Sequence, residues 1–148
     1  MIRVMFLAVC SLLPTTISAE FYSMDTDGDV DRKLAIEAAQ CSGFTEFMTQ
    51  LAEKASKPEQ VENFWLQTAA LQTYAALTFV NRLDYSEDNA KSMIYEITGI
   101  SANKIAQDML KDFANTHEIW SKQCDPYLLR ARELAESTGW LRSSQPAE

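Results

Sequence analysis

Residues 34–55 read LAIEAAQCSGFTEFMTQLAEKA, and their apolar side chains recur at steps of three or four residues. That spacing places one apolar stripe on a 3.6-residue helix. Asp31, just before the stretch, is a residue type that caps helix N-termini. We therefore expect a helix from about residue 31 to residue 55. Its stripe consists of Leu34, Ala38, Cys41, Phe44, Met48, Leu51 and Ala55.

A second helix is predicted for residues 58–83, because Pro58 suits the first turn of a helix. Within it, the segment NFWLQTAALQTYAALTFVN, residues 63–81, contains no charged side chain. A run of this length without charge raises the alternative of a membrane span. Five polar side chains argue against a span, because they are costly in hydrocarbon: Gln67, Thr68, Gln72, Thr73 and Thr78. We therefore interpret the segment as the buried central helix of a bundle. Its expected core side chains are Phe64, Trp65, Leu71, Tyr74, Leu77 and Phe79.

The rest of the chain continues the helical pattern. Ser86 is a suitable N-cap for a helix that Gly99 ends or kinks. A longer helix is expected from about residue 102 to residue 123, and Asp125 with Pro126 opens a last one that runs toward Gly139. No segment alternates apolar and polar residues between turn residues, so we predict no sheet. The predicted fold class is all-α: an up-and-down bundle of four to five helices over residues 31–142, followed by a disordered polar tail, residues 143–148.

The first 19 residues, MIRVMFLAVCSLLPTTISA, have the layout of a secretory signal peptide. They combine one cation, an apolar run of about ten residues and a small residue, Ala19, before the expected cleavage site. The run is too short for a membrane anchor. We therefore expect a periplasmic or secreted protein whose mature chain begins with an acidic arm, residues 20–30.

Export would leave two of the three cysteines in the mature chain, Cys41 and Cys124. In an oxidising compartment, two such cysteines without a CxxC motif are more often joined to each other than used as a metal or redox site. We predict one disulfide between them. Gly43, close to Cys41 in mid-helix, lowers helix propensity by about 1 kcal/mol, and we expect it to admit a close helix neighbour.

Four aspartates at alternate positions form a candidate metal site: Asp25, Asp27, Asp29 and Asp31. Carboxylate oxygens at this spacing suit Ca²⁺. The register does not fit an EF-hand, because Val30 falls at the glycine position and Ile36 at the closing ligand position. We therefore favour a solvated arm whose last aspartate caps the first helix.

His117 is the only histidine, which excludes catalytic triads, zinc sites with two histidines and the HExxH motif. A haem held between Met48 and His117 is one alternative, since both lie on inward stripes. Aromatic side chains at helical spacing more often pack in a core than line a cavity, so we expect packing roles for them. The residues in question, as ligand site or core, are Trp65, Tyr74, Phe113, His117 and Trp120.

With 13 Lys and Arg against 21 Asp and Glu, the net charge is -8, the wrong sign for binding nucleic acid. The chain has no glycine-rich phosphate loop and no catalytic motif, so we expect neither enzymatic activity nor a cofactor. The favoured hypothesis is an exported interaction module, such as an inhibitor, an immunity-like protein or an accessory subunit, with a basic partner protein. The alternative is a carrier of a small apolar ligand, Ca²⁺ or haem within the bundle. Neither hypothesis includes stable membrane insertion.

Overall fold

The computed structural model describes residues 29–139, which form four helices. The helices are α1 (Val30–Lys54), α2 (Pro58–Leu83), α3 (Glu87–Lys111) and α4 (Phe113–Ser137). They contain 91% of the described residues, and none of these residues lies in a strand. The prediction of an all-α fold is confirmed, with the smaller of the two expected numbers of helices.

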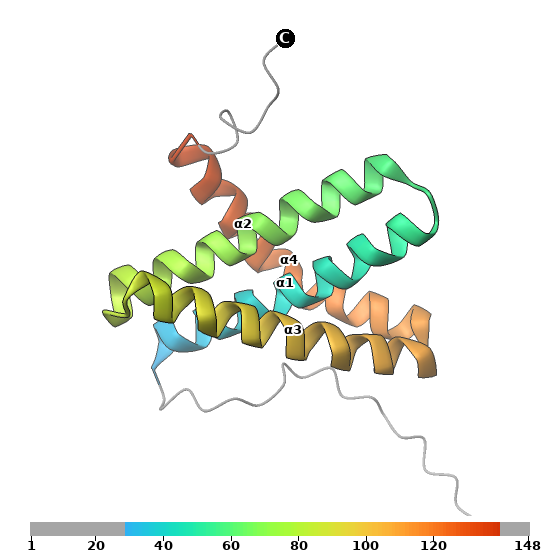
Figure 1. The fold of residues 1–148 in the computed structure, drawn as a ribbon, viewed down its shortest axis with the longest axis horizontal. Coiled ribbons are helices and arrows are strands. Elements are labelled where there is room, and N and C mark those ends of the chain that lie inside the picture. Colours follow the sequence, from blue (N-terminus) through green and yellow to red (C-terminus); the bar gives the residue numbers. More distant parts are fainter. Residues whose placement is uncertain (1–28, 140–148) are drawn as a thin grey trace, which may run out of the picture.

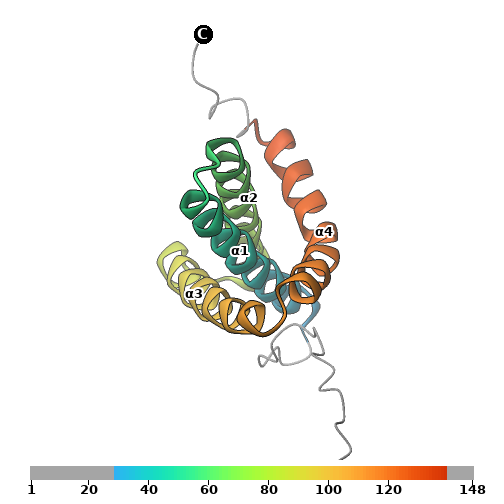
Figure 2. The same cartoon turned by 90° about the vertical axis from the view of Figure 1, so that its right-hand side faces the viewer.

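Consecutive helices run in opposite directions, as in an up-and-down bundle (Figure 1). α1 and α2 form a hairpin, and α3 returns along the hairpin. α4 crosses the hairpin at an angle instead of running parallel to it. Figure 2 shows α3 and α4 on opposite sides of the α1 and α2 pair, with the C-terminal half of α4 diverging from it.

The first turns of the helices carry the expected capping residues, with one difference. Ser86 caps α3 through a hydrogen bond from a first-turn amide, as predicted. Pro58 occupies the first turn of α2. α1 begins earlier than expected, because the side chain of Asp29, not that of Asp31, accepts a hydrogen bond of 2.9 Å from a first-turn amide. Asp31 lies inside the first turn, where a negative charge favours the helix dipole.

The boundary between the last two helices lies at Asp112, so the predicted helix end at Gly99 and the predicted helix start at Asp125 and Pro126 were wrong. Asp112 ends α3 with an extended backbone and then caps α4, because its carboxylate accepts a hydrogen bond of 3.1 Å from the Asn115 amide. α3 continues through Gly99. α4 continues through Pro126, an exposed position, although proline cannot donate the helical hydrogen bond to the carbonyl of Lys122.

The centre of the bundle is α1, and the prediction that α2 is the buried central helix was wrong. Every residue from Ala38 to Thr45 is buried, so this part of α1 has neighbours on all sides. Its side chains are mostly small, which lets the other helices approach closely. The side chains of α2 are larger than those of this part of α1, and most of them are half-buried. The fully buried residues of α2 are Leu71, Ala75, Thr78 and Phe79. No helix in residues 29–139 is both long and apolar enough to cross a membrane.

Cys41 and Cys124 are joined by a disulfide, with sulfurs 2.10 Å apart and Cα atoms 5.5 Å apart. This pairing confirms the prediction. Both cysteines are 0% exposed, so the bond lies inside the core. Cys124 lies in the middle of α4, not at a helix end as expected, and the bond therefore ties the central helix to the middle of the crossing helix.

Candidate functional site

The two described members of the predicted calcium site both make contacts within the fold. Asp29 caps α1, and Asp31 forms an ion pair with Arg82 of α2 at 3.1 Å. Asp25 and Asp27 lie outside the described residues. Within residues 29–139, no three His, Cys, Asp or Glu side chains come together in a way that could hold a metal ion.

His117 lies in a row of aromatic rings at the start of α4. Its ring is 5.8 Å from that of Phe44 on α1 and 5.9 Å from that of Phe113, measured between centroids. The ring of Phe44 is also 6.3 Å from that of Trp120. Met48, the other residue of the haem hypothesis, packs against the hydrophobic core. Three of the five predicted aromatic site residues, Phe113, His117 and Trp120, are thus brought together.

The other two predicted aromatic residues lie elsewhere. Tyr74 packs against the core and lines a groove between α2 and α4. Trp65 is 56% exposed, beside the turn that connects α1 to α2, so the expectation that it packs in the core was wrong. Phe113 is also half exposed, at 50%, whereas Trp120 is buried.

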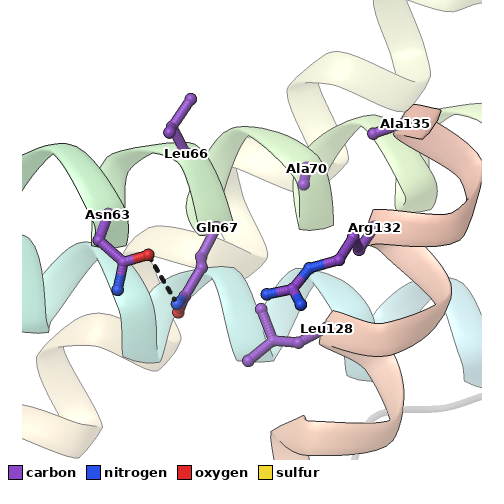
Figure 3. A pocket seen from close by; sticks show the side chains of 7 residues that line it. All are labelled: Asn63, Leu66, Gln67, Ala70, Leu128, Arg132 and Ala135. Atoms are coloured by element: carbon purple, nitrogen blue, oxygen red, sulfur yellow. Dashed lines mark hydrogen bonds between the residues drawn. The ribbon is translucent and has the colours of Figure 1, made fainter. Parts of the chain in front are cut away.

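The candidate site is a cleft between α2 and the diverging half of α4 (Figure 3). Its volume is about 220 Å³. Four aliphatic side chains, two amides and one guanidinium line it, and most of these belong to the uncharged segment of α2. The residues are Asn63, Leu66, Gln67 and Ala70 from α2, with Leu128, Arg132 and Ala135 from α4.

The polar side chains of this cleft point toward one another. Gln67 donates a hydrogen bond of 3.5 Å to the amide oxygen of Asn63, and Arg132 extends from α4 toward Gln67 (Figure 3). No acidic side chain in residues 29–139 forms an ion pair with Arg132. This includes Glu136, which is exposed and lies one turn after Arg132 on α4. The guanidinium faces an uncharged wall of α2.

A second cavity, of about 400 Å³, lies on the other side of the α4 crossing. It contains two cations, Arg82 and Arg130, of which Arg82 is already paired with Asp31. Arg130 lies over the ring of Tyr127, 6.0 Å from its centroid. The remaining lining residues of this cavity are Leu34, Tyr74, Leu77, Thr78, Asn81 and Leu134.

A partly buried hydrogen bond joins α1 to α4 and helps to hold α4 across the hairpin. The hydroxyl of Tyr127 donates to the carboxylate of Glu37, which is also paired with Lys33 at 3.8 Å. Burial raises the pKa of Tyr127 well above its usual value of 10.0, the hydrogen bond and the negative charge of Glu37 raise it further, and Arg130 opposes them. Tyr127 therefore stays protonated as a donor at neutral pH.

Sequence reasoning did not identify the cleft between α2 and α4. The signal that could have found it is the charge-free run of α2 together with Arg130 and Arg132, which lie two residues apart and so face opposite sides of one helix. Comparison of the chain with protein-family models, with curated proteins and with solved structures finds no match.

Proposed function

We propose that this protein is an exported, non-catalytic binding module that holds a partner protein along α2 and in the cleft beside it. An inhibitor, an immunity-like protein and an accessory subunit are the roles that match this description. The observation that carries the proposal is the absence of charge on α2 from Asn63 to Asn81, in a helix that is only partly buried.

Burial within the molecule does not account for this absence. Four residues of α2 are fully buried, most of the others are half-buried, and Trp65 is 56% exposed. Half-exposed helix positions normally tolerate Lys and Glu, and charged residues are depleted mainly where a surface is covered by a partner. Trp65 belongs to the same uncharged run but lies on the face of α2 away from the cleft, two residues from Asn63 and from Gln67. An exposed tryptophan is typical of a binding hot spot, so we expect the partner to contact this face of α2 as well.

The charge of the whole chain indicates the kind of partner. The net charge is -8, and Glu59 and Glu62 are exposed on the first turns of α2. An uncharged surface bordered by acidic residues favours a partner with an apolar contact area and a basic rim. Charges at the rim raise the association rate and are screened by salt.

A photocrosslinking experiment in the native host tests this proposal. A benzophenone amino acid replaces Trp65 on α2 in one variant and Asn103, an exposed residue of α3, in a control variant. We expect a discrete crosslinked protein from position 65 and none from position 103. Equal crosslinking from the two positions would contradict the proposal. If the affinity of the protein for the captured partner does not change with salt concentration, the proposed basic rim of the partner is wrong.

The alternative function, a carrier of a small apolar ligand or of a metal ion such as Ca²⁺, has a separate test. The two cavities beside α4 lie at the surface between helices, which suits a partner side chain better than an enclosed ligand. Native mass spectrometry of protein isolated from its host would support the carrier role if it showed a stoichiometric added mass.

A further inference from the structure

We infer that the cleft between α2 and α4 binds the C-terminal residue of a partner protein, through its free α-carboxylate and an apolar side chain. This inference rests on the proposed function and specifies the chemistry of one contact. The residues that would make the contact are Arg132, Gln67 and Asn63 for the polar groups, and Ala70, Leu128 and Ala135 for the side chain.

Arg132 provides the reason for a carboxylate. The chain contains 21 acidic residues, yet the guanidinium forms no ion pair with those in residues 29–139 and is directed toward neutral amides. A guanidinium presents parallel N–H donors that match the two oxygens of a carboxylate. Arg132 is exposed, as are Lys33 and Lys122, but these two lysines each pair with a glutamate four residues away on their own helix. Among residues 29–139, the cleft therefore has a cation without an ion pair, which an incoming carboxylate would supply.

The size and lining of the cleft limit the apolar part of the ligand. A volume of about 220 Å³ is below the range of roughly 300 to 1,000 Å³ that is usual for drug-sized ligands. It suits one aliphatic or aromatic side chain. Ala70, Ala135 and Leu128 supply aliphatic contacts without a competing charge. One apolar residue adjoining a carboxylate is the arrangement found at the end of a polypeptide.

The amides of Asn63 and Gln67 distinguish a chain end from a free fatty acid. Each amide offers both donors and an acceptor, and the hydrogen bond of 3.5 Å between them uses one N–H and one oxygen. The remaining groups match the N–H and C=O of a peptide bond next to the terminal residue. An alkyl chain in the same place would leave these polar groups without partners, which is unfavourable.

The test compares three probes by calorimetric titration of the purified protein: a short Gly- and Ser-rich peptide that ends in a free leucine, the same peptide with an amidated end, and hexanoate. We expect the free peptide to bind about tenfold more tightly than the amidated peptide, because a charge-assisted hydrogen bond is lost. We expect hexanoate to bind at least as weakly as the amidated peptide. The side-chain amide NMR signals of Asn63 and Gln67 should shift with the free peptide.

Two variants of one helix provide the control. Arg132→Gln should remove the preference for the free peptide, whereas Arg130→Gln, on the other side of α4, should keep it. Equal binding of the free and amidated peptides, or equal effects of the two variants, would overturn the inference. Hexanoate binding as tightly as the free peptide would overturn the assignment to a chain end. If crosslinking from position 65 succeeds while the peptides show no preference, the inference fails and the proposed function stands.

Discussion

Single residues decide how closely the helices pack, and Gly43 is the clearest case. A Cβ atom at this position would lie 2.7 Å from the carbonyl oxygen of Thr98, 2.8 Å from Cβ of Ser101 and 2.9 Å from the amide of Ala102. The expectation that Gly43 admits a close neighbour is therefore confirmed, and the neighbour is α3. Beside this contact, the hydroxyls of Ser42 and Thr98 are hydrogen bonded at 2.6 Å.

Substitution of the two helical glycines should have opposite effects. Gly43→Ala forces α1 and α3 apart, because two of the three nearest atoms belong to backbone, and it should lower the free energy of unfolding by about 1 to 3 kcal/mol. Gly99→Ala, with nothing within 4 Å of the new Cβ, should raise it by about 0.5 to 1 kcal/mol through helix propensity. Urea denaturation measures both. A neutral Gly43→Ala variant would show that the contact with α3 is looser than described.

The hydrogen bond from Tyr127 to Glu37 makes stability depend on alkaline pH. The pKa of Tyr127 is raised in the folded state. The contribution of the protonated hydroxyl to the unfolding free energy is therefore complete below pH 10, where the unfolded chain also keeps this proton. It is lost as the pH rises from about 10 through the folded-state pKa. Between pH 9 and 11, the unfolding free energy of the wild type should therefore fall more than that of Tyr127→Phe. At pH 7 the variant should be less stable by about 1 to 2 kcal/mol. Tyr95→Phe, at a tyrosine that is 66% exposed, serves as the control and should match the wild type.

Local capping signals and tertiary packing both influence where a helix ends, and packing outweighed the local signals at Gly99 and at Pro126. Pro126 looks like a helix start in the sequence, yet α4 runs through it. Cys124, Tyr127 and Ala131, on both sides of the proline, are buried on one face of α4, so a break there would disrupt the contact of this face with the core. The free energy lost with one backbone hydrogen bond at this exposed proline is smaller than the free energy that would be lost with the packing of this face.

The real boundary between α3 and α4 can be tested by removing either aspartate. Asp112→Ala removes the side-chain acceptor for the Asn115 amide and should lower the unfolding free energy by about 1 kcal/mol. Asp125→Ala, at an exposed position within α4, should change it by less than about 0.5 kcal/mol. Thermal melts followed by circular dichroism would compare the two. A larger loss from Asp125→Ala would place the boundary where the sequence pattern suggested it.

At the scale of the whole molecule, the disulfide links residues that are 83 positions apart and that lie at the centre of α1 and in the middle of α4. The angle of α4 creates the cleft with α2. The connection of α4 to the core through Cys124, and through Tyr127 to Glu37, therefore fixes the geometry of the candidate site. The half of α4 beyond these contacts carries Leu128, Arg132 and Ala135, which line the cleft.

Loss of the disulfide should cost about 4.5 kcal/mol on chain-entropy grounds, because it closes a long loop in the unfolded chain. The Cys41→Ala and Cys124→Ala double variant, compared with the wild type in urea, measures this cost. The same comparison for the wild type with and without reductant should agree with it. Mass spectrometry after alkylation without reductant should find neither thiol free in protein from the native host, and two alkylated cysteines would contradict the structure.

The amino-acid pattern alone was enough to predict the all-α class, most of the helical regions, the partners of the disulfide and the close approach at Gly43. These features depend on local periodicity, on the count of cysteines and on the size of one residue, all of which the chain carries explicitly. Three other features follow from the arrangement of the helices in space: α1 is central, α3 and α4 meet at Asp112, and Arg132 faces Gln67. Those features depend on which helices cross and at what angle, and such long-range packing outweighs local signals like Gly99 and Pro126.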